Sequence, residues 1–169
     1  AGEQGNHIES NGKDGIAIGD AVNGTAATDN QINDNLIRNN TRHGVLITDA
    51  TSVRNKITKN SITGNGQLGI KVDVNAQQGI KPPVVTTSSD TYVRGTATAN
   101  ATIEVYSDPG TRSQRLLATF PSALSDDVVQ AAATNQMLTA YSLADYEGQL
   151  YLGTTQADGN GVWEFQFTQ

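Results

Sequence analysis

The chain has 169 residues, a formal net charge of −6 and no cysteine. The lack of cysteine excludes disulfides, thiol catalysis and thiolate metal sites, and with no basic surplus we expect no nucleic-acid partner. Its apolar runs are too short to cross a bilayer, so we expect no membrane insertion.

Composition divides the chain in two. Residues 1–75 hold twelve of the fifteen asparagines and no aromatic residue, whereas the first aromatic residue is Tyr92. Between them, Pro82 and Pro83 impose a stiff, extended segment. We therefore predict a domain over residues 1–75, a linker over 76–83 and a second domain over 84–169.

A repeat organises the first domain. The motif N-x-I-x-x-N-x-x-x-G-[IV]-x-[IV] occurs three times without a gap, starting at Asn6, Asn35 and Asn60. Its glycines, Gly15, Gly44 and Gly69, are 29 and 25 residues apart, a period typical of solenoids. The four extra residues of the first interval are expected to bulge within residues 19–27.

Short alternating aliphatic pieces in each repeat indicate β-strands. A chain that runs a short strand, bends at Asn or Gly and returns after about 25 residues forms a parallel β-helix whose coils stack about 4.8 Å apart. Aliphatic side chains would then fill the interior, with Ile37 and Ile62 in register. The repeated asparagines would form ladders at the corners.

Over residues 5–75 this repeat resembles the right-handed parallel β-helix coils of the pectate-lyase-like superfamily, especially those of secreted, carbohydrate-associated bacterial proteins. The resemblance implies about three coils and an all-β fold. Because the pattern of the first coil begins almost at Ala1, without a polar cap, we expect the chain to be the C-terminal end of a longer solenoid. Upstream coils of the parent protein would then be a partner.

The second domain contains β-rich runs, among them 92–97, 102–106 and 162–167. Residues 95–106 and 152–165 resemble the two hallmark segments of bacterial Ig-like modules, which implies a small, non-catalytic β-sandwich. The alternating Trp163, Phe165 and Phe167 are expected in its core. The chain departs from that family at about 109–146, where Ser125-Asp126-Asp127 predicts a capped helix through 128–133, ending near Met137 or Leu138.

Three candidate catalytic residues come from rows of stacked turn positions: Lys13, Arg42 and His43. In the lyases of the superfamily that the repeat resembles, a Lys or Arg removes a proton beside a uronate carboxylate. Lys13 and Arg42 occupy one position in successive coils, with Gln67 next. We favour the alternative that these turn residues are simply solvated, because no cluster of acids accompanies the bases.

Three carboxylates are candidate metal ligands. Asp20 and Asp49 each follow their repeat glycine by five residues, and Asp73 falls one position short. Stacked like charges either splay into water or hold a cation such as Ca²⁺ between them, and we favour splaying. No cofactor is required by any motif.

The first functional hypothesis is a secreted or surface bacterial segment in which the sandwich caps the solenoid and supports attachment to a polysaccharide or cell-surface component. The alternative is part of a polysaccharide lyase, hydrolase or epimerase with catalytic residues upstream of Ala1. We favour the non-enzymatic reading and expect an extracellular or cell-surface location. Self-association is expected through the first coil, around Ile8, Ile16 and Ile18.

Overall fold

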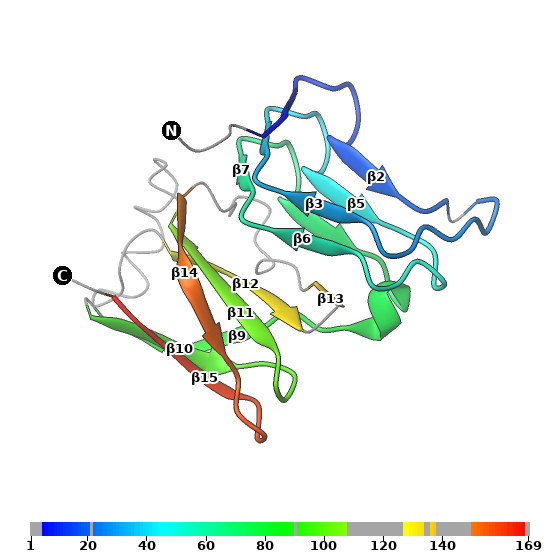
Figure 1. Cartoon of the computed structure of the whole chain (residues 1–169). Coiled ribbons are helices and arrows are strands. Elements are labelled where there is room, and N and C mark those ends of the chain that lie inside the picture. Colours follow the sequence, from blue (N-terminus) through cyan, green and yellow to red (C-terminus); the bar gives the residue numbers. More distant parts are fainter. Residues whose placement is uncertain are drawn as a thin grey trace.

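The structure is a computed structural model that describes residues 5–20, 22–89, 91–107, 127–133, 136–137 and 150–167. Figure 1 shows two parts, each built of β-strands. We call the part from β1 to β8 the solenoid and the part from β9 to β15 the second unit. Among the described residues, the one helical element is the 3-10 turn η1 (Ala76–Gly79).

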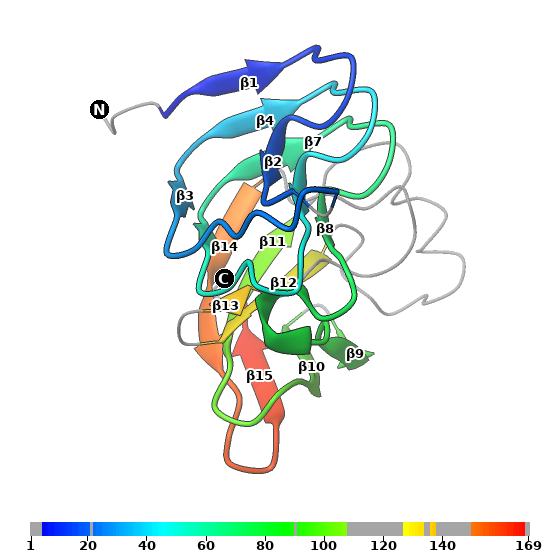
Figure 2. The ribbon, with the colours of Figure 1, turned by 90° about the vertical axis from the view of Figure 1, so that its right-hand side faces the viewer.

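The solenoid consists of three parallel sheets, each stacking one strand per turn of the chain. The first sheet holds β1 (His7–Glu9), β4 (Leu36–Arg38) and β7 (Ser61–Thr63). The second holds β2 (Ile16–Ile18), β5 (Val45–Ile47) and β8 (Ile70–Val72). The third holds β3 (Gln31–Asn33) and β6 (Lys56–Thr58). Figure 2 shows the strands of successive turns lying one above another.

Aliphatic side chains fill the interior of the solenoid in register, as the repeat predicts. Ile8 pairs with Ile37, and Ile37 pairs with Ile62. Ile37 and Ile62 have no exposed surface. The offset between stacked strands changes from 29 residues at β2 to 25 at β3, so the extra residues bulge between Ile18 and Gln31, where Asp20 and Thr25 form a small bridge.

Asparagine ladders hold two corners of the solenoid, which confirms the predicted rows. The Nδ2 of Asn6 donates to the Oδ1 of Asn35 at 3.1 Å, and Asn35 donates to Asn60 at 3.0 Å. In the second row Asn11 donates to Asn40 and Asn40 donates to Asn65, both at 2.8 Å. Each acceptor oxygen also receives a backbone N–H of the preceding asparagine. The side chains thus satisfy backbone groups at bends where strand pairing stops.

A third ladder was not predicted. Asn30 donates to Asn55 at 2.8 Å, and the Nδ2 of Asn55 donates to the Oε1 of Gln77 at 3.2 Å. Gln77, in η1, is fully buried and returns a hydrogen bond from its Nε2 to the Asn55 carbonyl at 2.7 Å. The residues that follow β8 therefore pack against the solenoid, and Ala76 is part of its hydrophobic core.

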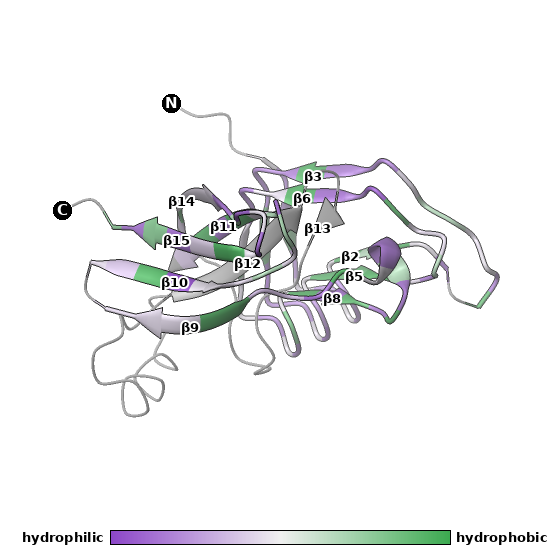
Figure 3. Ribbon diagram, turned by 90° about the horizontal axis from the view of Figure 1, so that it is seen from below, coloured by the Kyte–Doolittle hydropathy of each residue, from purple (hydrophilic) through white to green (hydrophobic). Residues whose placement is uncertain are grey.

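The second unit contains two antiparallel sheets. One has the order β15-β10-β9, with β9 (Val84–Ser88), β10 (Tyr92–Thr96) and β15 (Val162–Gln166). The other has the order β13-β12-β11-β14, with β11 (Thr102–Ser107), β12 (Asp127–Ala133), β13 (Gln136–Met137) and β14 (Leu150–Gln156). Figure 3 shows hydrophobic and hydrophilic positions alternating along β10 and β15.

The two sheets share one core. Val93, Ile103 and Trp163 are buried in it, and Phe165 and Phe167 pack against it, as predicted for the aromatic row. Segment 158–161 is a turn between β14 and β15, in which the Gly161 N–H donates to the Asp158 carbonyl at 3.0 Å.

The prediction of a helix over 128–133 is wrong, because Asp127–Ala133 forms β12. This strand pairs antiparallel with β11, from Thr102 opposite Ala132 to Ser107 opposite Asp127. Seven residues make an isolated helix marginal, and the paired Val128 and Val129 favour an extended backbone. Pairing with the free edge of β11 outweighs the helix propensity of the three alanines. Within the same insertion Gln136–Met137 forms β13, and its remaining residues lie outside the described part of the chain.

Candidate functional site

Three exposed polar side chains form a row on one flank of the solenoid, which we call the Lys13 row: Lys13, Arg42 and Gln67. The Arg42 N–H donates to the Lys13 carbonyl at 3.0 Å, and the Gln67 N–H donates to the Arg42 carbonyl at 2.9 Å. The predicted register of this row is therefore confirmed. Its side chains are spaced by one coil, about 4.8 Å.

Next to that row, Asp14 and His43 form a bonded pair. The Asp14 side chain is only 7% exposed, and its Oδ1 accepts the His43 backbone N–H at 3.1 Å. Its Oδ2 lies 3.6 Å from the Nη1 of Arg42. The carboxylate thus satisfies a backbone donor of the next turn and partly balances the charge of Arg42.

His43 continues the same arrangement toward the following turn. It is 8% exposed, and its Nδ1 accepts the Leu68 backbone N–H at 3.2 Å. Burial lowers the pKa of His43 below its usual value, Asp14 opposes this shift, and Lys71 and Arg42 add to it. An Nδ1 that accepts a backbone N–H carries no proton, so the imidazole is neutral with its proton on Nε2.

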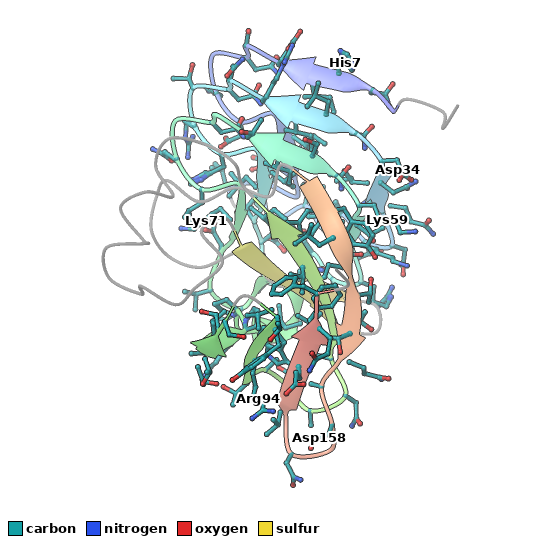
Figure 4. All side chains as sticks on the ribbon, turned by 90° about the vertical axis from the view of Figure 1, so that its left-hand side faces the viewer. His7, Asp34, Lys59, Lys71, Arg94 and Asp158 are labelled. Carbon is teal, nitrogen blue, oxygen red and sulfur yellow. The ribbon has the colours of Figure 1, made fainter. Side chains whose placement is uncertain are left out.

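The candidate catalytic residues therefore divide into two kinds. His43 and its neighbour Asp14 are engaged with backbone groups and hold the turns together, as the asparagine ladders do. Lys13 and Arg42 present exposed side chains whose N–H groups can bind carboxylates or hydroxyls. Lys71 lies on the same side as His43, on the flank opposite Lys59 and Asp34 (Figure 4).

The three candidate metal ligands are bound within their own turns. Asp20 Oδ1 accepts the N–H of Val22 at 2.9 Å, and Asp49 Oδ1 accepts the N–H of Thr51 at 2.7 Å. Asp73 pairs with Lys71 at 3.5 Å.

These hydrogen bonds favour the ionised form of the first two carboxylates. Hydrogen bonds lower the pKa of Asp20 and of Asp49, and the charge of Asp20 opposes the shift at Asp49. Among the described residues no group of three or more His, Cys, Asp or Glu is placed to hold a metal ion. Asp20 and Asp49 lie in register on successive coils, and a cation between them stays a prediction.

One buried acidic residue had no signal in the sequence. Glu104, in β11, is 5% exposed and lies at the junction between the second unit and the solenoid. Its Oε2 accepts the Lys59 backbone N–H at 3.2 Å and the Tyr106 hydroxyl at 2.6 Å, and the Thr58 hydroxyl donates to Oε1. Burial, followed by the Glu104 charge, raises the pKa of Tyr106, which keeps the phenol protonated as a donor.

Further contacts surround this junction. The Nζ of Lys59 lies 5.9 Å from the centre of the Tyr151 ring in β14, and the Tyr151 and Tyr106 rings meet edge to face at 5.4 Å. Figure 2 shows the four-stranded sheet beneath the last turn of the solenoid. No described helix is long and apolar enough to cross a membrane.

Parallel strand stacking, buried aliphatic rows and corner ladders together define a β-helix. The family model for a right-handed β-helix region matches residues 4–96, more than half of the chain. The chain belongs to the right-handed β-helix family. The match extends into β9 and β10, but parallel pairing ends at Val72, and we take the pairing as the limit of the solenoid. The search of curated proteins found no match.

Proposed function

We propose that the chain is a non-enzymatic structural and binding segment of a secreted or cell-surface bacterial protein. In this proposal about three coils of the pectate-lyase-like type are closed by an Ig-like sandwich, with the boundary at residues 76–83. The sandwich caps the solenoid, and the exposed flank attaches to a polysaccharide or cell-surface component.

The contact of Glu104 with Thr58 and Lys59 is the observation that carries the capping part of the proposal. A carboxylate that is 5% exposed would be costly to bury unless several donors satisfied it. Here its donors come from both the solenoid and the second unit. Such a contact favours a fixed junction over two units that move independently.

The Lys13 row supports the binding part. Its three exposed side chains offer N–H donors, and Gln67 also offers a carbonyl acceptor. The coil spacing is similar to the length of one sugar unit in an extended polysaccharide, so neighbouring side chains could contact successive units. Residues 1–75 hold no Phe, Trp or Tyr, so the proposal assigns no role there to a sugar stacked on one of these rings.

The alternative enzymatic reading is favoured by one feature, the stacked Lys13 and Arg42. Catalytic groups are usually held in a cleft, whereas Lys13 and Arg42 are both exposed on the flank of the solenoid. The proposal therefore assigns this row to binding, while the catalytic residues of a parent lyase, hydrolase or epimerase would lie elsewhere.

Affinity electrophoresis through gels containing acidic or neutral polysaccharides tests the proposal. We expect retardation by at least one polymer, reduced for Lys13→Ser with Arg42→Ser and unchanged for Lys56→Ser, an exposed lysine of β6. Uronate polymers incubated with the chain should develop no double-bond absorbance. Absence of retardation would overturn the binding assignment, and absorbance that is lost in Arg42→Ser would favour the lyase reading.

A further inference from the structure

Four asparagines of the chain are followed directly by glycine: Asn11, Asn23, Asn65 and Asn160. An asparagine in this position is chemically labile, because a glycine without a side chain leaves its backbone nitrogen open to approach the asparagine side chain. Attack of that nitrogen on Cγ expels the side-chain amide as ammonia. The reaction needs a peptide group that can rotate into this arrangement, so the surroundings of each Asn-Gly pair decide how fast the pair reacts.

Two of the pairs lie in the corner ladder of Asn11, Asn40 and Asn65 and are fixed there. The Gly66 N–H donates to the Asn40 carbonyl at 2.8 Å, and Asn65 itself is only 4% exposed. The Asn11 carbonyl accepts the Thr41 N–H at 2.9 Å, which holds the peptide group that Asn11 shares with its glycine. A peptide group held in this way cannot rotate until its hydrogen bond opens, so folding should slow the reaction at both sites.

The pair at Asn160 is fixed as well. It lies in the turn between β14 and β15, where the Gly161 N–H donates to the Asp158 carbonyl at 3.0 Å. The Oδ1 of Asp158 also accepts the Asn160 N–H at 2.8 Å. The attacking nitrogen is therefore occupied, although the Asn160 side chain is exposed. This pair is thus accessible to water but protected by the geometry of its turn.

The pair at Asn23 differs from the other three. It lies in the bulge between β2 and β3, on the side of the solenoid away from the second unit (Figures 1 and 3). Asn23 and Gly24 are both exposed, and no described residue forms a hydrogen bond with the peptide group between them. An added Cβ on Gly24 would lie 4.0 Å from the Oδ2 of Asp49, an ordinary contact distance. The Gly24 nitrogen therefore has room to turn toward the Asn23 side chain.

The contacts of Asn23 are local and exposed. Its Nδ2 donates to the Oδ2 of Asp20, and its backbone N–H donates to the Oδ1 of Asp20 at 3.2 Å. Both hydrogen bonds join residues only three positions apart in an exposed turn, so water competes with them. Neither hydrogen bond involves the peptide group that Asn23 shares with Gly24. The side chain is therefore oriented by Asp20, while the group that must rotate is not held.

We propose that Asn23 is a site of spontaneous deamidation. The Gly24 nitrogen gives up its proton to water or hydroxide and bonds to Cγ of Asn23, and the bond between Cγ and Nδ2 breaks, which releases ammonia. Water then opens the cyclic imide at either of its carbonyl carbons, which leaves aspartate or isoaspartate at this position. Across both steps the amide and one water become a carboxylate and ammonium, and nothing is oxidised or reduced.

The product changes the charge of the bulge. A carboxylate replaces the amide that donates to Asp20, and Asp49 already places a second carboxylate beside Gly24. Like charges so close together repel one another. The Thr25 N–H donates to the Asp20 carbonyl at 3.1 Å in the small bridge that closes the bulge. This bridge should therefore open more readily after the reaction.

Peptide mapping by mass spectrometry, after incubation at mildly alkaline pH, tests the site. We expect the folded protein to deamidate at Asn23 at least about tenfold faster than at Asn65 or Asn160. In guanidinium chloride all four pairs lose their hydrogen bonds and should react at similar rates, which separates the effect of the fold from that of the local sequence. Gly24→Ala should slow the reaction at Asn23, because the added methyl group hinders the approach of the nitrogen.

Hydrogen exchange of Asn23→Asp, which carries the product charge from the start, tests the consequence. Exchange of the Thr25 N–H should be faster than in the wild type, whereas the Val45 N–H, which donates to the Gly69 carbonyl inside the solenoid, is the control and should not change. An Asn23 that reacts no faster than Asn65 in the folded protein would overturn the proposal. So would a rate at Asn23 that folding slows as much as at the other pairs, and unchanged exchange at Thr25 would overturn the expected opening of the bulge.

Discussion

The buried carboxylate of Glu104 accepts the backbone N–H of Lys59 at 3.2 Å, so a side chain of the second unit satisfies a donor of the solenoid. Lys59 has a positive φ of 54°, and its N–H lies at a bend where strand β6 ends. The contact joins residues that are 45 positions apart in the chain.

Removing this carboxylate should destabilise the protein strongly. Glu104→Ala leaves the Tyr106 hydroxyl and the Lys59 N–H without their acceptor, so we expect a loss of about 2–4 kcal/mol in the free energy of unfolding. Urea denaturation measures it. Glu164→Gln is the control, because Glu164 is an exposed partner of Arg94. This substitution should hardly change the urea concentration at which half of the protein is unfolded. Equal effects of the two variants would contradict the account.

Within the corner ladder, the interior asparagine should matter more than the terminal one. Asn40 is 1% exposed and its Oδ1 accepts two hydrogen bonds from Asn11, so Asn40→Ala should cost about 2–3 kcal/mol. Asn11→Ala removes one exposed donor and should cost less than about 1 kcal/mol. Thermal or urea unfolding compares the two. A larger loss for Asn11→Ala would mean that the ladder does not stabilise the turns.

The buried aliphatic rows predict a second contrast. Ile37 is fully buried, so Ile37→Ala should cost about 2–5 kcal/mol. The neighbouring Arg38 points outward with its side chain 42% exposed, and Arg38→Ala should cost less than about 1 kcal/mol despite its pairing with Glu9. Similar losses in urea denaturation would show that the register of β4 is wrong.

Acid should destabilise the protein through His43. Its pKa is lowered in the folded protein from the usual 6.5, so the unfolded chain binds this proton first. The free energy of unfolding should therefore fall as the pH drops below 6.5 and stop falling, for this residue, below the folded pKa. Urea midpoints of the wild type and His43→Gln across this range measure it, and the variant should have the smaller slope. Equal slopes would contradict a neutral, buried imidazole.

Much of the solenoid could be predicted, because the spacing of its repeat determines which residues are in contact. Asn35 and Ile37 recur at fixed spacing, and stacking turns equal positions into neighbours. The third ladder has a signal in the sequence, because Asn30 and Asn55 each precede a repeat isoleucine, Ile32 or Ile57, by two residues. Its last member, Gln77, lies outside the repeat spacing, so no periodicity could assign it.

The second unit was harder to predict because no repeat indicates which of its strands pair. Strand β12 reads as a helix in isolation, and only the edge of β11 makes it extended. Likewise, nothing around Glu104 distinguishes it from an exposed glutamate of an alternating strand. Its burial depends on where the whole sheet meets Thr58, and this is a property of the assembled fold.

The most direct test of a closed solenoid is a double-mutant cycle between Thr58→Val and Glu104→Gln, followed by urea denaturation. If the second unit closes the solenoid, we expect one cooperative transition and a coupling free energy on the order of 1–3 kcal/mol between the two residues. Additive effects within about 0.5 kcal/mol, with separate transitions for the solenoid and the second unit, would contradict it.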